Sequence, residues 1–224
     1  MAGKLYIVAT PIGNLEDITF RAVKVLKEID IIFAEDTRVT KRLLDHYQID
    51  KTLHSYHQHS LLAKRELILQ YLATGKSMAL VTDAGTPGVS DPGNELIDYL
   101  SEFLPPESIV PVPGASSLTA ALSVSGFNVS KFIFLGFWPK KKVNKVIKLI
   151  ESVKMPIAFF ESPHRIIKTL REIGEKLGME RRVLVARELT KIHETLYRGT
   201  VREVLSKLEA EKIKGEIVVV VEGS

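Results

Sequence analysis

The 224-residue sequence contains no cysteine. This absence excludes a disulfide framework, a zinc or iron–sulfur site with thiolate ligands, and a thiol nucleophile. Long apolar runs are also missing, since none approaches the roughly 18 to 20 residues that a membrane-spanning helix needs. The start, Met-Ala-Gly-Lys-Leu-Tyr, has no signal-peptide pattern and leads directly into a predicted strand. Together these absences predict a soluble, cytoplasmic protein with no membrane partner.

Charge is only mildly unbalanced. The 31 Lys and Arg residues exceed the 27 Asp and Glu residues, which leaves a net charge of +4 and a pI near 9.1. This excess is small for a nucleic-acid-binding protein, so the basic residues matter for binding only if they gather on one face. With 45% hydrophobic residues, the chain can bury a sizeable core. We expect two small domains rather than one large domain.

The first half alternates short strand-like runs with segments of helical periodicity, which is typical of βαβ units and a parallel sheet. The predicted strands lie at residues 5–9, 31–34, 53–56, 78–82 and 109–112. A first helix is capped by Thr19, and the later helices lie at 37–46, 61–72, 94–103 and 116–125. The fold class is therefore α/β, with a parallel five-stranded sheet in the N-terminal lobe.

The second half has a different rhythm. Its predicted strands lie at 132–136, 157–160, 183–187, 194–198 and 217–221, and its predicted helices at 143–153, 166–177 and 201–212. Only six residues separate the third and fourth of these strands, too few for a parallel crossover, so we predict an antiparallel pair in a mixed sheet. We place the domain boundary near residues 128–131. Residues 1–127 then form one α/β lobe and residues 128–224 the other, with a cleft between them.

In open α/β sheets, ligands bind at the carboxyl ends of the strands, so the loops that follow the strands are the first candidates for a site. Three such loops are rich in Gly, Pro and small hydroxyl residues: TPIGNLED (Thr10–Asp17), VTDAGTPGVSDPG (Val81–Gly93) and PVPGASS (Pro111–Ser117). Glycine lets a ligand approach the backbone, and proline reduces the entropy lost on binding. One such loop could be an ordinary turn. Three of them favour a site for a small, polar, mostly uncharged ligand.

Other kinds of site find little support. The chain has no Walker sequence, no dinucleotide fingerprint and no G-x-S-x-G nucleophile elbow. His54, His57 and His59 are close together in HSYHQH, but this segment is a predicted strand and turn in which the first two would point to opposite faces. We therefore predict no metal site.

Two polar segments of the second half are further candidates. FFESPHR (Phe159–Arg165) ends a strand and begins a helix, where Ser162 is a plausible N-cap. Capping does not explain the presence of His164 together with Arg165. ARELTKIHE (Ala186–Glu194) is more charged than a connection between two strands requires. Solvated surface charge is the alternative explanation for each of these residues.

Basic residues gather twice. Arg38, Lys41 and Arg42 would share a helix face directly after the second strand, at the same rim as the glycine-rich loops, where they could bind substrate phosphates. The second cluster lies on the outer side of the predicted helix 143–153, where solubility is the simpler explanation. It consists of Lys141, Lys145 and Lys148, with Trp138, Lys140 and Lys142 beside it.

These segments together resemble the tetrapyrrole methylase superfamily. The motifs that carry the resemblance are LYIVATPIGNLEDITFRA, AEDTRVTKRLL, SYHQHS, VTDAGTPGVSDPG, VPGASSLTAAL, FLGFWP, FFESPHR, ARELTKIHET and GEIVVVVEG. They run in this order along nearly the whole chain, starting at Leu5. The superfamily implies a two-lobed α/β fold that binds S-adenosylmethionine in the cleft between the lobes, usually as a homodimer.

The resemblance also implies which residues contact this cofactor. They follow strands of the first lobe or lie on strands of the second: Pro11, Ile12, Gly13, Asp83, Gly85, Thr86, Pro87, Gly88, Ser116, Ser117, Phe160, Ala186 and Val218. Among them, the glycines of the second loop would allow close approach of the cofactor, and Pro87 would hold that loop in shape.

Within the superfamily, the motifs are most similar to those of enzymes that methylate the ribose 2′-hydroxyl of a cytidine in 16S rRNA. This likeness implies 16S rRNA, within the 30S subunit, as the partner. A ribose hydroxyl is a weak acid, so a general base or a stabilising cation should lie close to it. The candidates for these roles are Glu35, Asp36, Arg38, Lys41, Glu161, His164, Arg165, Arg187 and Glu188.

Better-known members of this group continue past VVVEG into a small C-terminal extension that this sequence does not contain. RNA would then be held by the basic clusters or by a partner. Two alternatives stay open: a methyltransferase acting on a tetrapyrrole or another small molecule, and a non-catalytic RNA-binding relative. The basic rim argues against the first, because phosphate contacts favour Lys and Arg. The intact cofactor loops argue against the second.

Overall fold

The structure, a computed structural model, describes residues 3–57 and 62–223. The chain forms two compact units, residues 1–116 and 117–224, and each has its own hydrophobic core. This division comes earlier than the boundary predicted near residues 128–131, because helix α5 (Ser117–Ser123) packs against two strands of the second sheet. No helix in the described ranges is both long and apolar enough to cross a membrane.

The first unit is a five-stranded sheet in the order β3-β2-β4-β1-β5. Its strands are β1 (Leu5–Val8), β2 (Ile31–Ala34), β3 (Thr52–Ser55), β4 (Met78–Val81) and β5 (Ile109–Val112). All neighbouring strands are parallel, which confirms the sequence prediction. Every residue of β2 and β4 is buried, as expected for inner strands covered on both faces.

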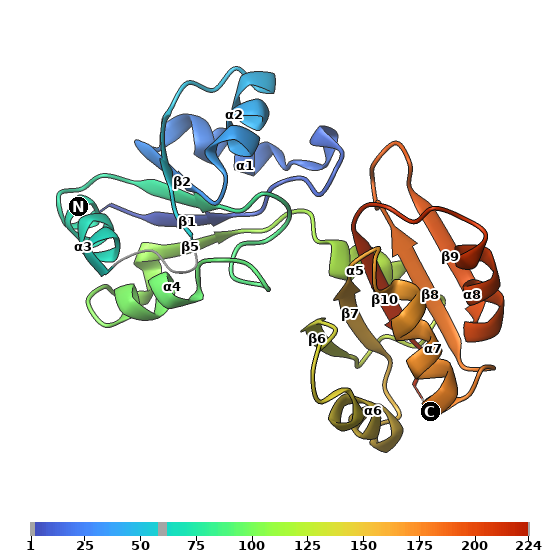
Figure 1. Cartoon of the computed structure of the whole chain (residues 1–224). Helices are drawn as coiled ribbons and strands as arrows, with labels where there is room; N and C mark the ends of the chain where they lie inside the picture. Colours follow the sequence, from blue (N-terminus) through green and yellow to red (C-terminus); the bar gives the residue numbers. More distant parts are fainter. Residues whose placement is uncertain (1–2, 58–61, 224) are drawn as a thin grey trace. The chain divides into compact units, whose positions relative to one another are not determined.

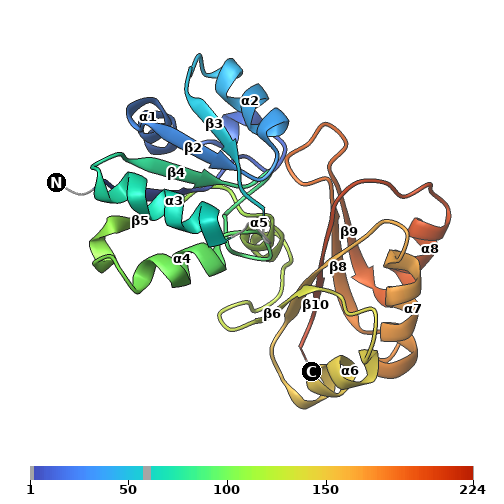
Figure 2. The same ribbon diagram turned by 60° about the vertical axis from the view of Figure 1, so that its left-hand side comes forward.

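Helices cover both faces of this sheet (Figures 1 and 2). Apolar residues of α1 (Phe20–Glu28) and α2 (Thr37–His46) form a core on one face, and those of α3 (Leu62–Ala73) and α4 (Asn94–Ser101) form a core on the other. Short 3-10 turns, η1 (Leu15–Asp17) and η2 (Pro106–Ser108), complete the unit. The predicted cap of the first helix is confirmed, since the Thr19 hydroxyl accepts the N–H of Ala22.

The second unit is a mixed sheet in the order β6-β7-β10-β8-β9. Its strands are β6 (Ile133–Phe137), β7 (Ile157–Glu161), β8 (Arg182–Arg187), β9 (Thr195–Thr200) and β10 (Ile217–Val221). Only β6 and β7 are parallel, whereas β10 is antiparallel to both its neighbours. The antiparallel pairing of β8 with β9, predicted from their short connection, is confirmed.

One face of the second sheet is buried under α6 (Val143–Ser152), α7 (Ile166–Leu177) and α8 (Val201–Glu209). Phe159, Val185 and Val219 point into this core. Helix α5 contacts β7 and β10 but contributes nothing to that core, so it lies on the other face (Figure 1). Because side chains alternate along a strand, residues next to the core residues point to the α5 face.

Candidate functional site

The three glycine-rich loops meet at the carboxyl edge of the first sheet. Thr10 and Gly85 exchange two backbone hydrogen bonds, with N–O distances of 2.9 and 3.1 Å. The Thr10 hydroxyl also donates to the carbonyl of Thr82 at 3.1 Å, and this group is buried. The Thr86 hydroxyl reaches the carbonyl of Ala115 in the third loop at 3.5 Å. The loops predicted from sequence to act together are thus held together by their own polar groups.

Two glycines permit this close approach. Gly85 has a φ of +82°, and a Cβ added there would lie 3.5 Å from the Ile12 side chain and 3.7 Å from the carbonyl of Ala115. A Cβ on Gly114 would lie only 3.0 Å from the Cβ of Ala9. Glycine at position 85 therefore allows a left-handed backbone conformation, and glycine at position 114 allows the third loop to pack tightly on the end of β1.

The predicted cofactor residues of these loops divide by exposure. Pro11, Ile12, Gly85 and Pro87 are buried and form the packed base of the loops. The others are exposed or half-buried: Gly13, Asp83, Thr86, Gly88 and Ser116.

Carboxylates gather beside these loops. One oxygen of Asp83 accepts the backbone N–H of Asp36 at 2.9 Å, which ties the end of β4 to the end of β2. Partial burial, together with the neighbouring charge of Asp83, raises the pKa of the Glu35 carboxyl. Glu35 therefore holds a proton more readily than an ordinary glutamate.

Asp36 behaves in the opposite way. Its carboxylate accepts hydrogen bonds from the Arg38 guanidinium, at 3.0 Å from Nε and 2.6 Å from Nη2, and it caps α2 by accepting the Arg38 N–H. These bonds hold the pKa of Asp36 well below its usual range. Asp36 is thus an ionised anchor for Arg38.

The first basic cluster is partly neutralised by its neighbours. Lys41 forms an ion pair with Asp45 at 2.7 Å, which raises the pKa of Lys41, and Arg38 is paired with Asp36. Arg42 is exposed and has no ion pair within residues 3–57 and 62–223. The face predicted to bind phosphates therefore carries less uncompensated charge than the sequence suggested.

In the second unit, three predicted cofactor residues form one row across adjacent strands. Val218 of β10 pairs with Phe160 of β7 on one side and with Ala186 of β8 on the other. The strand pairing extends the row to Phe137 of β6 and Leu196 of β9. We call these five residues the apolar row; it lies on the α5 face, and Ser117 begins α5.

Phe137 and Leu196 were not identified from the sequence. Phe137 is 64% exposed, and its ring packs edge-on against that of Phe160 with centroids 5.4 Å apart. Leu196 is 36% exposed. The alternation of side chains along β6 and β9 could have indicated their direction, but the strand pairing that aligns them with Val218 is visible only in the fold.

Glu161 and Arg165 point elsewhere. Glu161 is 3% exposed and accepts hydrogen bonds from Ser162 N–H at 2.7 Å and from the Thr169 hydroxyl at 2.6 Å. Arg165 lies 3.6 Å from this carboxylate and donates to the carbonyls of Trp138 and Pro139. These bonds hold the turn after β6 against the turn after β7.

The predicted N-cap role of Ser162 is wrong, because the residue that directly precedes α7 is Arg165. Helix α7 begins at Ile166, and residues 162–165 form a preceding turn in which the Ser162 carbonyl accepts the N–H groups of Arg165 and Ile166. The buried Glu161 carboxylate binds the Ser162 N–H and so favours this turn over an earlier helix start. His164 is exposed on the turn.

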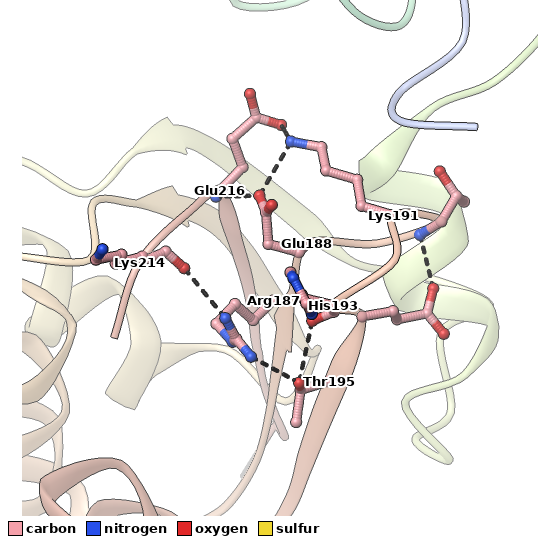
Figure 3. A network of polar contacts seen from close by, with 9 residues as sticks. Arg187, Glu188, Lys191, His193, Thr195, Lys214 and Glu216 are labelled. Atoms are coloured by element: carbon pink, nitrogen blue, oxygen red, sulfur yellow. Dashed lines mark hydrogen bonds and ion pairs between the residues drawn. The ribbon is translucent and has the colours of Figure 1, made fainter. Parts of the chain in front are cut away.

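Arg187 and Glu188 belong to a polar network at the start of the β8–β9 loop (Figure 3). The Arg187 guanidinium donates to the Thr195 hydroxyl at 2.9 Å and to the Lys214 carbonyl at 3.5 Å. Since Val183 and Val185 point into the helix-covered core, Arg187 lies on that face, opposite Ala186.

Glu188 forms the centre of a clamp that we define as Glu188, Lys191 and Glu216. The Glu188 carboxylate accepts the Glu216 N–H at 2.9 Å and the Lys191 ammonium at 3.0 Å, and Lys191 also reaches Glu216 at 3.1 Å. Partial burial alone would raise the pKa of Glu188, but these hydrogen bonds and the charge of Lys191 outweigh it and lower the pKa. The clamp ties the β8–β9 loop to the segment before β10.

Within the described part of the chain, no three His, Cys, Asp or Glu side chains are grouped so as to hold a metal ion. His54 stacks on Phe33 with ring centroids 5.6 Å apart. His59, the third member of the histidine group in the sequence, lies outside the described residues.

Comparisons with known proteins agree with this architecture. The family Tetrapyrrole (Corrin/Porphyrin) Methylases matches residues 4–205. Ribosomal RNA small subunit methyltransferase I of Thermotoga maritima is 48% identical over 222 residues, which cover 99% of both chains. The protein of the same name from Bacillus subtilis is 44% identical over 99% of this chain and 76% of its own length.

A solved structure, that of the cobalamin biosynthetic enzyme cobalt precorrin-4 methyltransferase, has the same fold. It matches with a TM-score of 0.74 and 21% sequence identity over 98% of this chain and 94% of its own. The chain therefore belongs to the Tetrapyrrole (Corrin/Porphyrin) Methylases, and within that family its relatives are the ribosomal RNA small subunit methyltransferases I.

Proposed function

We propose that this protein transfers a methyl group from S-adenosylmethionine to the ribose 2′-hydroxyl of a cytidine in 16S rRNA. The observation that carries the proposal is the 48% identity to a ribosomal RNA small subunit methyltransferase I over 99% of both chains. The enzyme would act in the cytoplasm as a homodimer, with the rRNA of the 30S subunit as its substrate.

The chemistry of the predicted cofactor residues fits S-adenosylmethionine. Thr86 and Ser116 offer hydroxyl groups, and Asp83 offers a carboxylate whose second oxygen is not engaged by Asp36. In the apolar row, Val218 and Ala186 are buried, whereas Phe160 is half-buried and Phe137 is exposed, so the two aromatic rings offer surface to the flat parts of such a ligand. When bound, the cofactor supplies an electrophilic methyl group on a sulfonium, and the protein supplies binding and orientation.

Glu35 is the best candidate for the general base. Its raised pKa, caused by partial burial and by the charge of Asp83, makes its carboxylate a stronger base than the ionised Asp36. Glu35 would accept the proton of the ribose hydroxyl. Arg38, which is oriented by Asp36, would stabilise the negative charge that develops on the ribose oxygen.

The second-unit candidates receive different roles. Glu161 and Arg165 bond to the protein around the turns after β6 and β7, and Arg187 and Glu188 bond to the segment before β10. We assign these four residues to holding the loops in place. His164, which is exposed, is left as the second-unit candidate for contact with substrate.

Labelled S-adenosylmethionine tests the function directly. The protein is incubated with bare 16S rRNA, with 30S subunits or with a porphyrin precursor, and labelled RNA is digested to nucleosides. We expect label in a 2′-O-methylcytidine from one of the RNA substrates. Label in the porphyrin would favour the small-molecule alternative, and RNA binding without any label would favour a non-catalytic relative.

A further inference from the structure

The chain contains one long segment without negative charge. Residues 108–150 hold six lysines and no aspartate or glutamate. Five of the six lysines lie close together in sequence, in the turn after β6 and on the outer side of α6: Lys140, Lys141, Lys142, Lys145 and Lys148. All five are exposed, and we call them the lysine face.

The packing of α6 fixes the direction of this face. Ile147 and Ile150 are buried in the core of the second unit, and Val143 and Val146 pack against that core. Lysines three or four positions apart on a helix lie on the same side, so Lys145 and Lys148 point away from the core together. The sequence had indicated that Lys141 belongs to the helix, but it lies in the turn before α6.

The charge of the lysine face is uncompensated. Across the described ranges, none of its five members forms an ion pair, whereas Lys24, Lys41 and Lys168 each pair with a carboxylate four residues later. The corresponding position after Lys145 is Leu149, and after Lys148 it is Ser152. Surface lysines that serve only solubility are commonly mixed with acidic residues. The one acidic residue of α6 is Glu151, three positions after Lys148, and in the described ranges it forms no ion pair with a lysine.

The turn that begins the lysine face is held firmly at the site edge of the sheet. The N–H of Trp138 donates to the carbonyl of Phe160 at 2.9 Å, and Arg165 donates to the carbonyls of Trp138 and Pro139 at 3.3 and 3.1 Å. Phe160 belongs to the apolar row. The lysine face therefore starts beside the second-unit residues that we propose to contact the cofactor.

We propose that the lysine face binds phosphates of the substrate RNA. This inference rests on the proposed function, since it names the surface by which an rRNA would be held. Lysine ammonium groups bind phosphates as point charges, and such contacts supply most of the sequence-independent affinity for nucleic acids. An anionic membrane is a poorer fit, because a helix that lies on a membrane needs an exposed apolar face and that of α6 is buried.

The test is a triple variant, Lys141→Ala with Lys145→Ala and Lys148→Ala. Each lost phosphate contact reduces the slope of log K against log salt by about 0.7 to 0.9. We expect the slope for 16S rRNA to fall by about 2 and the affinity at 0.1 M salt to fall at least about tenfold. The triple Lys→Arg variant, which keeps the charge, should bind like the parent protein.

The control is Lys24→Ala with Lys27→Ala and Lys168→Ala, which loses the same charge from other exposed sites. It should retain the parent salt slope, and both alanine variants should bind S-adenosylmethionine and melt like the parent. The inference is overturned if the two alanine variants bind RNA equally, or if only binding to phosphatidylserine vesicles is lost.

The outcomes also separate this inference from the proposed function. If the parent protein methylates 16S rRNA and the lysine-face variant does so with unchanged affinity, only the lysine face is refuted. If the parent neither binds nor methylates RNA, both ideas fail together.

Discussion

Glu35 and Asp36 are adjacent in sequence at the end of β2, yet their surroundings shift their pKa values in opposite directions. Partial burial and the charge of Asp83 raise that of Glu35, whereas hydrogen bonds from Arg38 lower that of Asp36. Sequence alone could place both residues at the carboxyl edge of the sheet. It could not separate their roles, because the partial burial of Glu35 and its nearness to Asp83, which belongs to a later loop of the chain, arise only in the fold.

If Glu35 is the general base, Glu35→Gln should reduce the rate of methyl transfer about 100-fold or more, since general-base catalysis contributes about 10²- to 10⁴-fold to a rate. The same change should raise the melting temperature at pH 8. The raised pKa means that ionised Glu35 costs stability above its unfolded pKa of about 4.3, so the gain should vanish as the pH falls towards 4. Methyl-transfer assays and thermal melts between pH 4 and 8 measure both effects.

Asp36→Asn is the control, because it should change the melting temperature at pH 8 in the opposite direction. A lowered pKa stabilises the fold while the carboxylate is ionised, above about pH 4, and this contribution is lost as the pH falls through the folded pKa. The asparagine variant should therefore melt lower than the parent at pH 8 and approach it in acid. If both variants moved the melting temperature in the same direction at pH 8, the contrast between the two carboxylates would be wrong.

Secondary-structure elements were predicted well where hydrophobic periodicity is strong. Strands β2, β5 and β10 and helix α7 have the predicted bounds, because each is an uninterrupted apolar or amphipathic run. Helix ends were less accurate: α8 ends at Glu209 rather than Lys212. Such ends depend on local hydrogen bonds, as the wrongly predicted N-cap at Ser162 shows. The assignment of α5 to the second sheet depends on tertiary packing that periodicity does not encode.

The contribution of the clamp of Glu188, Lys191 and Glu216 to stability can be tested by one substitution. Gly215 has a φ of +89°, and a Cβ there would lie 2.3 Å from the Glu188 carboxyl carbon. Gly215→Ala should therefore lower the free energy of unfolding in two ways. The left-handed backbone conformation of an alanine costs about 1 kcal/mol, and loss of the clamp costs about 1 to 3 kcal/mol more.

Gly126→Ala is the matched comparison, because Gly126 has a φ of +76° and no atom within 4 Å of its added Cβ. It should cost only the strain. For a chain of this size, about 1 kcal/mol corresponds to roughly 2–4 °C in melting temperature, so thermal melts resolve the difference. Equal losses in the two variants would show that the clamp contributes little to stability.

The whole molecule joins two units that each bury a separate core. The sequence predicted two α/β units and the parallel and mixed character of their sheets. It did not predict the strand order β6-β7-β10-β8-β9, which brings the apolar row together from strands spread over residues 133–221. Strand order is set by long-range packing, so no local pattern reveals it.

Cofactor binding should stabilise the whole chain. A ligand present at 100 times its Kd adds about 2.7 kcal/mol to the free energy of unfolding. For S-adenosylmethionine this corresponds to a rise of roughly 5–10 °C in melting temperature, measurable by scanning calorimetry. Asp83→Ala should bind more weakly and show a smaller rise at the same concentration. No rise for the parent protein at millimolar cofactor would contradict the proposed cofactor.

Because side chains alternate between the two faces of a sheet, neighbouring residues of β7 and β8 have different roles. Phe160 and Ala186 belong to the apolar row, while Glu161 and Arg187, one position later, make the polar contacts that hold the loops. The gain or loss of a single codon within either strand would exchange these tasks, and a charged side chain would replace an apolar one on the α5 face. Insertions and deletions are thus far more damaging in these strands than in the turns between them, even where many substitutions would be tolerated.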